Sequence, residues 1–504
     1  MKRMTTIFVL AVSAFLLASC ADLQPPAGIP AELREIIEAN RAIAFPDFHP
    51  DFHDIASSFL TQDFDAETFE NLSDILRKMH SQNFASRRAA NEAADLDAYI
   101  TRVEAAWEIR FLFDLLRHAY AGYQHFGGDG VFLPLRDSML EQIAQMPDPL
   151  QVSSYLDHVL RRAFFNSPIL DLHFTINGMM GGRHRHWLHM CEDFTLRRAG
   201  DGFVVEIDGA TYNVIATNAA GGEPVDGIFP TLTRDGELAY AFARFAPASN
   251  PDAAEMSAVL ENAATGERRV LPVSLPRPSP FVSESEPMFE TRAEGDVTIA
   301  VNRTLRANDI EYQFFRWGTE LSNEPALVLD LRGHRGGNPE LARAWIGGLA
   351  GWPRHDLMFS RFSLESSIVP MLRGRALHAR NSMPEWSALH FSSGPRAVIP
   401  NDNLVIVLMD NNMASAGDAF VGFLRQLENA LFIGTNTMGM LVTVDLVEII
   451  LPHSGIAIRF GTSLHLRPDL SQFEGVGFLP DLWVPPGESL ERALAFIERY
   501  RLNR

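Results

Sequence analysis

The sequence predicts an α/β protein in three parts: a helical N-terminal region, a β-rich middle module and a C-terminal α/β domain. Apolar residues recur at three- and four-residue steps in the first part and alternate with polar ones in the second. In the third part they form continuous runs of strand length, each followed by a helical segment. The 504 residues are 46% hydrophobic and 21% charged, which is a globular composition with ample length for several cores.

The balance of charged residues narrows the range of partners and mechanisms. With 43 basic and 63 acidic residues, the formal net charge is −20. Such a chain repels phosphate backbones, so we expect no nucleic-acid partner. Lysine occurs only as Lys2 and Lys78, and almost every other positive charge is an arginine. This scarcity limits the side chains that could serve as a catalytic base.

The first residues predict an export signal over residues 1–19. Lys2 and Arg3 precede an apolar run that ends at Leu17 and is followed by small residues. This layout is typical of a signal peptide, and the apolar run is too short to cross a bilayer. Residues 20–30 contain three prolines and indicate a short tether.

The end of the signal resembles the lipobox of bacterial lipoproteins. Leu17-Ala18-Ser19-Cys20 has the pattern at which cleavage leaves a cysteine that carries lipid. The resemblance implies lipidation of Cys20, a membrane anchor through that lipid, and a location in the cell envelope, at the outer membrane or facing the periplasm. An ordinary signal peptide with a chance cysteine is the alternative. Lipidation would leave Cys191 without an intramolecular disulfide partner.

Residues 31–165 are expected to form a helical N-terminal domain. One series of apolar residues recurs on a single helical face: Leu96, Ile100, Val103, Trp107, Phe111 and Leu115. An amphipathic helix of this kind buries its apolar face against a partner. The region is therefore predicted to pack as a cap on a larger body.

Residues 166–270 are expected to form a β-rich module. A strand over residues 203–207, the turn dipeptide Asp208-Gly209 and a second strand over residues 210–216 are typical of a β-hairpin. The module shows no clear glycine-rich loop for binding a carboxylate.

Residues 271–288, rich in proline and serine, predict a linker to an α/β domain over residues 289–504. Within that domain, the continuous apolar runs Ala326–Leu331 and Leu404–Met409 have the length of parallel strands that are covered on both faces. In such sheets ligands bind at the carboxyl ends of the strands.

Both runs are followed by segments that could carry chemistry. The glycine-rich loop Arg332–Asn338 can turn backbone N–H groups inward and so bind an oxyanion. The segment Asn411–Asp418 leads into a helix and places Ser415 in a strand-to-helix turn. From the local sequence alone, capping of the helix is the commoner role for such a serine, so both roles remain open.

Several blocks together resemble the tail-specific, C-terminal-processing serine peptidases, from about Val297 to the C-terminus. The blocks are Asp171–Thr175, Asp330–Gly337, Ser415–Asp418, Gly434 with Thr437-Met438-Gly439, and Glu474–Asp481. The resemblance implies a crotonase/ClpP-like α/β catalytic domain, a polypeptide substrate and no cofactor. Many relatives carry a peptide-binding PDZ module, for which the β-rich module here gives no clear pattern.

The resemblance also implies roles for individual residues. Ser415 would be the nucleophile, and backbone N–H groups of Gly336 or Gly337 and of Ala416 would form the oxyanion hole. A serine hydroxyl needs an adjacent base. In one branch of the family that base is a lysine directly after the Thr-x-Gly element, where this sequence has Met440. A thioether cannot accept a proton, so a Ser–Lys dyad is not expected.

The tricorn-like branch of the family instead uses a histidine base with a carboxylate behind it. Here the matching residues are His173 and Glu474. We therefore expect Ser415 to attack a peptide carbonyl, His173 to act as general base and then acid, and Glu474 to orient the imidazole. The alternatives are a structural histidine and a carboxylate that lies on the surface or anchors a loop.

A metal site is a weaker alternative at His184, His186 and His189, because closely spaced imidazoles can share an ion. Arg183 and Arg185 lie between them and disfavour a cation. We expect neither a metal nor a cofactor.

The preferred function is a lipid-anchored serine peptidase that hydrolyses cell-envelope polypeptides through an acyl-enzyme. The alternative is a catalytically silent lipoprotein of the same fold that binds peptides or small apolar ligands. A crotonase-like acyl-CoA enzyme is a weaker third possibility, since no acyl-CoA motif is evident. The sequence leaves the oligomeric state open.

Overall fold

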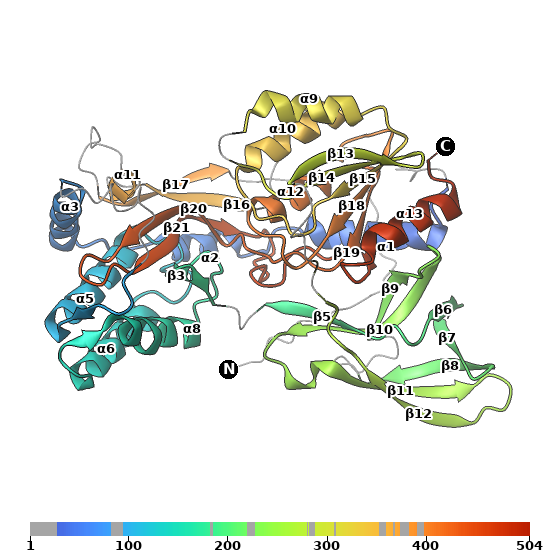
Figure 1. Ribbon diagram of the computed structural model, residues 1–504, viewed down its shortest axis with the longest axis horizontal. Coiled ribbons are helices and arrows are strands. Elements are labelled where there is room, and N and C mark those ends of the chain that lie inside the picture. Colours follow the sequence, from blue (N-terminus) through green and yellow to red (C-terminus); the bar gives the residue numbers. More distant parts are fainter. Residues whose placement is uncertain are drawn as a thin grey trace.

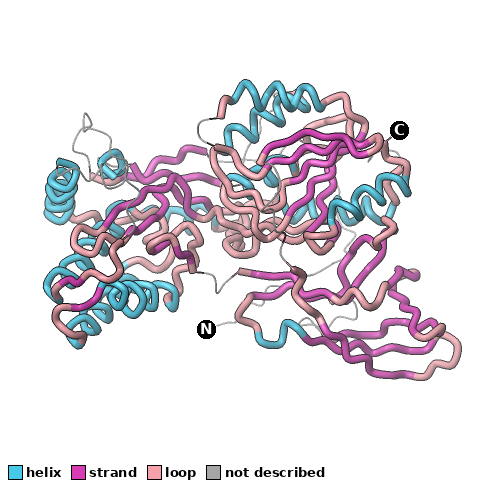
Figure 2. Tube along the Cα trace, viewed as in Figure 1, coloured by secondary structure: helices cyan, strands magenta, loops and turns pink. Residues whose placement is uncertain are grey.

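The computed structural model describes residues 28–81, 94–181, 185–218, 227–279, 281, 288–306, 309–351, 359–365, 368–372, 383–390 and 398–503. The predicted export signal, Cys20 and most of the tether lie outside these ranges. The described chain forms a helical region, a twisted β-module and an α/β domain that adjoins both (Figures 1 and 2).

The helical region lies to one side of the molecule (Figure 1). Its helices are α2 (Phe52–Leu60), α3 (Ala66–Ser81), α5 (Arg102–Ala119), α6 (Asp129–Gln145), α7 (Val152–Ser154), the π-helical turn η1 (Tyr155–Arg161) and α8 (Arg162–Asn166). The two-residue strands β1 (Tyr99–Ile100) and β2 (Leu150–Gln151) pair beside them.

Helix α5 begins later than its apolar spacing suggested. Thr101 accepts a hydrogen bond from the Glu104 N–H while the Glu104 carboxylate accepts one from the Thr101 N–H, which is a complete capping box. Leu96 therefore precedes the helix, and Val103 in the first turn is 77% exposed. The Thr-x-x-Glu signal was present in the sequence and marks the start better than the apolar period does.

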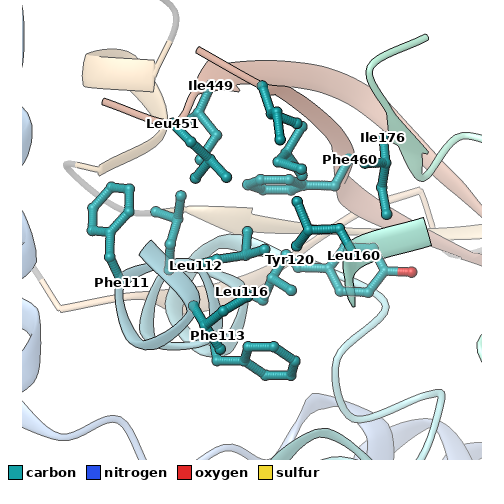
Figure 3. Packing of buried hydrophobic residues seen from close by; sticks show 14 of the residues in the cluster. Phe111, Leu112, Phe113, Leu116, Tyr120, Leu160, Ile176, Ile449, Leu451 and Phe460 are labelled. Atoms are coloured by element: carbon teal, nitrogen blue, oxygen red, sulfur yellow. The ribbon is translucent and has the colours of Figure 1, made fainter. Parts of the chain in front are cut away.

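The core of the helical region continues into a β-hairpin of the C-terminal domain. Side chains of α5, such as Leu112 and Leu116, pack against Ile449 of β20 (Thr443–Ile450) and Phe460 of β21 (Ala457–Leu466) (Figure 3). The helices thus bury their apolar face on this hairpin, in agreement with the predicted cap. Residues far apart in the sequence are in this way held in one rigid core.

The middle module is an antiparallel sheet with the strand order β12-β11-β8-β7-β6-β10-β5, and β9 pairs with β10. Its strands are β5 (His186–Met190), β6 (Leu196–Ala199), β7 (Gly202–Ile207), β8 (Ala210–Thr217), β9 (Ile228–Leu232), β10 (Leu238–Pro247), β11 (Glu255–Asn262) and β12 (Arg268–Ser274), with the 3-10 turn η2 (Pro251–Ala254) before β11. The predicted hairpin is confirmed as β7 and β8, joined by Asp208 and Gly209 with positive φ.

The α/β domain is built on a six-stranded sheet with the order β13-β14-β15-β18-β19-β22, parallel except for the β13–β14 pair. The strands are β13 (Phe289–Glu294), β14 (Val297–Asn302), β15 (Ala326–Asp330), β18 (Leu404–Met409), β19 (Ala430–Gly434) and β22 (Leu482–Trp483). Every residue of β15 and β18 is buried, so the predicted two-faced burial of these strands is confirmed.

Helices cover both faces of this sheet. One face packs on α9 (Glu311–Leu321), α10 (Pro339–Ala350) and α12 (Ala416–Leu424), and the other on α1 (Ala31–Ala44) and α13 (Ser489–Tyr500). Alternate residues of each strand point to each layer, as Leu327 and Val328 of β15 show.

A third sheet links the helical region to the α/β domain. Its order is β17-β16-β21-β3-β4, with β20 also paired to β21. The remaining elements are β3 (Thr175–Ile176), β4 (Met179–Met180), β16 (Ser360–Glu365), α11 (Ile368–Leu372) and β17 (Glu385–His390). The sheet therefore joins strands from both halves of the chain.

Three segments belong to other parts of the fold than the expected domain boundaries assign them to. Helix α1 packs on the α/β sheet beside α13 because its apolar stripe, Leu33 and Ile37, covers an otherwise open face. The histidine block leads into β3, which pairs with β21 and not with the β-module. Strand β12 extends to Ser274 and so takes up the start of the expected linker.

Across the described part of the chain, every helix is too short or too polar to traverse a bilayer.

Candidate active site

Ser415 lies in a sharp turn between β18 and α12. The serine has φ 58° and ψ −115°, a backbone conformation that non-glycine residues rarely adopt. It occupies the N-cap position of α12, yet its side chain makes no capping hydrogen bond. The helix-cap alternative therefore does not account for this hydroxyl. A strained serine at a strand-to-helix turn is instead typical of an exposed nucleophile.

The Ser415 hydroxyl meets His173. The distance between His173 Nε2 and Ser415 Oγ is 3.0 Å, although the two residues are 242 positions apart in the sequence. His173 precedes β3, which the pairing with β21 brings to the carboxyl end of the α/β sheet. The imidazole is 1% exposed, while Ser415 is only partly buried. The pair has the geometry of a nucleophile and its general base.

The environment of His173 favours the neutral imidazole. Burial and the nearby Arg459 guanidinium lower the pKa of His173 to about 3, and the Thr443 backbone carbonyl opposes them. No side chain within the described part of the chain hydrogen-bonds to the buried Nδ1, and the Thr443 carbonyl is the backbone group that faces the ring. A neutral ring with a free Nε2 lone pair can accept the Ser415 proton.

This lowered pKa predicts an unusual acid limb in the pH profile. The base stays neutral well below pH 6.5, so kcat/KM should remain level from about pH 7 to about pH 5, where an unperturbed histidine would lose about tenfold per pH unit. The rate of labelling by a fluorophosphonate, which carries no titrating group, measures this. Because burial also raises the pKa of Asp418 to about 6, the profile should be repeated with Asp418→Asn. A limb at pH 6.5 that persists in that variant would contradict the prediction.

Glu474 does not have the expected contact with the imidazole. One carboxylate oxygen accepts the Leu172 N–H at 2.7 Å, and the other accepts the N–H groups of Leu441 at 3.1 Å and Val442 at 2.8 Å. These three donors come from two segments of the backbone, so the carboxylate anchors two loops beside His173. Burial and the neighbouring Asp171 raise the pKa of Glu474 well above its usual range. The loop-anchoring alternative describes its contacts.

The glycine loop after β15 lies directly against Ser415. A Cβ on Gly336 would be 3.0 Å from Ser415 Cβ and 3.5 Å from the Ala416 nitrogen. Gly337 has φ 133°, and a side chain there would overlap the Leu305 carbonyl. Only glycine allows this approach of the two backbones.

The three expected oxyanion donors differ in their hydrogen bonds. The Gly336 N–H donates to His334 Nδ1 at 3.0 Å, so this donor is engaged within the loop. The N–H groups of Gly337 and Ala416 make no hydrogen bond with any described residue. Gly337 and Ala416, rather than Gly336, therefore remain as donors for an oxyanion.

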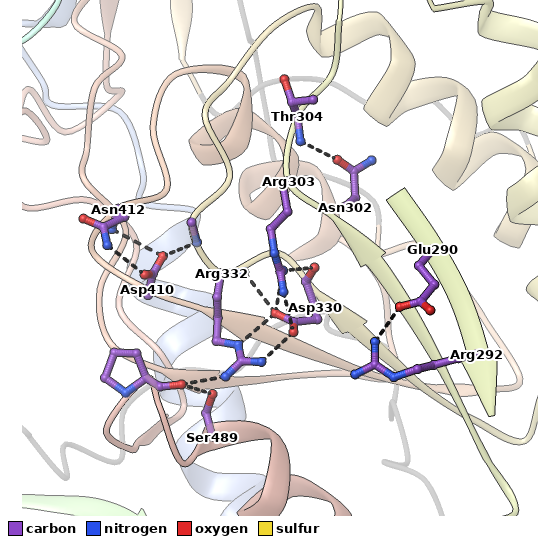
Figure 4. Close-up of polar contacts among 12 residues, drawn as sticks. Glu290, Arg292, Asn302, Arg303, Thr304, Asp330, Arg332, Asp410, Asn412 and Ser489 are labelled. Carbon is purple, nitrogen blue, oxygen red and sulfur yellow. Dashed lines mark hydrogen bonds and ion pairs between the residues drawn. The ribbon is translucent and has the colours of Figure 1, made fainter. Parts of the chain in front are cut away.

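Buried ion pairs hold the glycine loop in place (Figure 4). Arg303 and Arg332 both form bidentate hydrogen bonds with Asp330, at distances between 2.6 and 2.9 Å. Although burial alone would raise it, these cations lower the pKa of Asp330 to about 2. Asp410, at the end of β18, accepts the Gly333 N–H at 2.7 Å. The loops after β15 and β18 are thus tied together.

Asp418 is a site residue whose role was not assigned from its motif alone. Its buried carboxylate accepts the N–H groups of Gly439 at 2.8 Å and Met440 at 3.1 Å, and it faces the Ser415 N–H. The Ser-x-x-Asp spacing is the capping-box signal that could have identified it. Met440 therefore contributes its backbone N–H to the site and not its side chain. Lys78 lies in α3 of the helical region.

Two further residues near the site had no role assigned from the sequence. Asp171, two residues before His173, accepts the His173 N–H at 2.8 Å. His465 of β21 is buried, and burial with the nearby Arg361 lowers its pKa to about 3. A second histidine near the first gave no signal in the sequence, because the strand pairing that joins them is not local.

The histidines considered for a metal are not gathered into a site. His184 lies outside the described residues, and His186 and His189 belong to β5. Arg185 hydrogen-bonds to the backbone carbonyl and side chain of Asn411. In the ranges that the structure describes, no three potential metal-ligating side chains converge.

Comparisons with known proteins show what the chain is similar to. Residues 307–484 match the model of peptidase family S41. Similar solved structures include mature CPAF complexed with lactacystin (15% identity, TM-score 0.40, 79% of this chain and 97% of that chain) and the photosystem II D1 C-terminal processing protease (14%, 0.32, 78% and 97%). The tricorn protease is also similar (15%, 0.35, 79% and 37%). No curated protein matches the sequence. The family match does not favour the silent-scaffold alternative.

Proposed function

We propose that the chain is a serine-type peptidase that hydrolyses polypeptides of the cell envelope with a Ser415–His173 catalytic pair, and the match of residues 307–484 to peptidase family S41 supports this. The observation that carries the proposal is the 3.0 Å distance between Ser415 Oγ and His173 Nε2. It lies within the range in which a histidine takes a proton from a serine hydroxyl.

The reaction proceeds through an acyl-enzyme. His173 removes the proton from Ser415 as Oγ attacks the peptide carbonyl, and the resulting imidazolium then protonates the leaving amine. Water, activated by the same imidazole, hydrolyses the ester and releases Ser415. The N–H groups of Gly337 and Ala416 stabilise the oxyanion of each tetrahedral intermediate.

A fluorophosphonate probe tests the proposed chemistry directly. The full-length protein should be labelled on Ser415, as identified by mass spectrometry of the tryptic peptide, and should cleave an unfolded polypeptide. Labelling on another serine would contradict the assignment. Incubation with a cell-envelope extract, followed by identification of new peptide termini, tests the substrate class; new termini confined to cytoplasmic proteins would contradict it.

The proposed location depends on lipid at Cys20. The Cys20→Ser variant should accumulate as an unlipidated precursor, because the Cys20 sulfur is the atom that would carry the diacylglycerol. Mass spectrometry of the N-terminal peptide and fractionation of the envelope measure this. Cys191→Ser is the matched control, since Cys191 is a buried free cysteine and its loss should leave lipidation intact. A wild-type protein with an unmodified mature N-terminus at another residue would contradict the anchor.

A further inference from the structure

Asp171 is a buried carboxylate beside the proposed base that the mechanism above does not use. One oxygen, Oδ1, accepts the His173 N–H at 2.8 Å. The other, Oδ2, accepts the hydroxyl groups of Tyr120 and Thr443, each at 2.7 Å. Asp171 is 5% exposed, and none of the ion pairs among the described residues includes it. Its negative charge is therefore balanced by hydrogen-bond donors alone.

The three donors to Asp171 come from three parts of the fold. His173 belongs to the turn before β3, Thr443 begins β20, and Tyr120 directly follows α5 of the helical region. Asp171 is thus a point at which the helical region hydrogen-bonds to the histidine turn. The hydroxyl of Tyr120 is the polar part of this connection, and Phe174, the residue after His173, packs against Tyr120 and Phe164 at centroid distances of 5.6 and 4.8 Å.

The packing around Tyr120 fixes where its hydroxyl points. The ring is fully buried and makes an edge-to-face contact with Phe132 at a centroid distance of 6.2 Å. It makes another with Phe460 at 6.0 Å (Figure 3). Burial, together with the charge of Asp171, raises the pKa of Tyr120 well above its usual value. The hydroxyl therefore keeps its proton and donates a hydrogen bond to Asp171.

We propose that Asp171 is a positioning residue for His173, and that Tyr120 makes the helical region part of the catalytic apparatus. This inference rests on the proposed function. Among the described residues His173 Nδ1 has no carboxylate partner, so the ring is oriented through its own backbone and the Thr443 carbonyl that faces it. Two consecutive N–H groups of that backbone are held by separate carboxylates, Leu172 by Glu474 and His173 by Asp171. Movement of this turn changes the distance from Nε2 to Ser415.

Tyr120→Phe is the sharpest test, because it removes only the hydroxyl and retains the ring. Loosening the histidine turn should lower kcat by about tenfold with KM unchanged, since displacement of a catalytic group by less than 1 Å affects the chemical step and not substrate binding. The rate of fluorophosphonate labelling at Ser415 should fall by the same factor. Thr443→Val removes the other side-chain donor with little change in shape and should have a similar effect.

Tyr123→Phe is the matched control. Tyr123 is also a buried tyrosine whose hydroxyl donates to a carboxylate, Asp129, at 2.9 Å, but that carboxylate begins α6 and is remote from the histidine turn. We expect Tyr123→Phe to keep the wild-type kcat. Thermal unfolding of both variants shows whether any loss of stability is equal in the two.

The outcomes separate the two proposals. Wild-type kcat and labelling rate in Tyr120→Phe, or an equal fall of kcat in Tyr123→Phe, would overturn the positioning role while leaving the Ser415–His173 pair intact. A lower kcat in Tyr120→Phe, with KM unchanged and Tyr123→Phe normal, supports it. Retention of full activity in Ser415→Ala would overturn the proposed function and this inference together.

Discussion

Replacing Ser415 by alanine is expected to lower kcat by about a million-fold, the magnitude found when a serine peptidase loses its nucleophile. That factor corresponds to about 8 kcal/mol of activation free energy. The physical reason is that, among the described residues, Ser415 is the hydroxyl placed 3.0 Å from the His173 imidazole in a strained turn. The remaining rate would come from the oxyanion donors and substrate binding. Hydrolysis of a fluorogenic peptide and fluorophosphonate labelling measure the loss.

A matched serine separates chemistry from folding. Ser489 is fully buried at the start of α13, where its hydroxyl donates to the Pro486 carbonyl at 3.1 Å. Ser489→Ala should retain wild-type kcat, whatever it costs in stability. Ser415→Ala should unfold at the wild-type temperature or slightly above, since removing the side chain leaves the φ of 58° unchanged and breaks no capping bond. Peptide hydrolysis above a thousandth of the wild-type rate in Ser415→Ala would contradict the assignment.

Replacing His173 by glutamine should reduce kcat almost as far as the loss of Ser415. Without an imidazole the hydroxyl keeps its proton, and no lysine is available to take it, since Lys78 lies in α3. Because nucleophile and base act as a unit, the double variant Ser415→Ala/His173→Gln should be no slower than Ser415→Ala alone. Single-turnover hydrolysis of an activated ester measures the acylation step in each variant.

His189→Gln is the control for this prediction. His189 lies on β5 of the β-module and is only partly buried, so its replacement should leave kcat unchanged. Two results would contradict the role of His173: acylation in His173→Gln at more than a hundredth of the wild-type rate, or a further large loss in the double variant, which would mean that the two residues act independently.

Local sequence signals explain why most of the fold could be predicted. The apolar runs of β15 and β18 were identifiable because a strand buried on both faces needs apolar residues at every position. The hairpin of β7 and β8 followed from Asp208-Gly209, which readily adopts positive φ. The start of α5 was misplaced because a weak apolar spacing outweighed the capping box at Thr101.

The pairing partners of local elements were harder to predict. Helix α1 has an ordinary amphipathic pattern, and nothing in it distinguishes the α/β sheet from the other helices as a partner. Its Arg41 donates to the carbonyls of Leu427 and Glu428, contacts that no local pattern encodes. The same holds for β3, whose two residues find their partner in β21.

The candidate site shows the same division between residue types and contacts. Ser415, the glycine loop and His173 were named from motifs, and the loss of lysine at Met440 favoured an imidazole. The motif also suggested that Glu474 would contact the ring, whereas its oxygens bind three backbone N–H groups. A buried carboxylate accepts hydrogen bonds from the backbone N–H groups around it in preference to the imidazole, because a buried donor without a partner costs free energy of folding.

By itself, the sequence determined the chemistry available to this protein. It supplies a serine in a strand-to-helix turn, a glycine loop for an oxyanion, and a histidine as the base in place of the lysine that one branch of the family uses. The tertiary structure alone decided that His173 meets Ser415, that Gly336 is engaged by His334, and that Asp171 is held from the helical region. Residue types and turn geometry are local properties of the chain. The distance between groups 242 positions apart depends on how strands and helices pack, which no local pattern specifies.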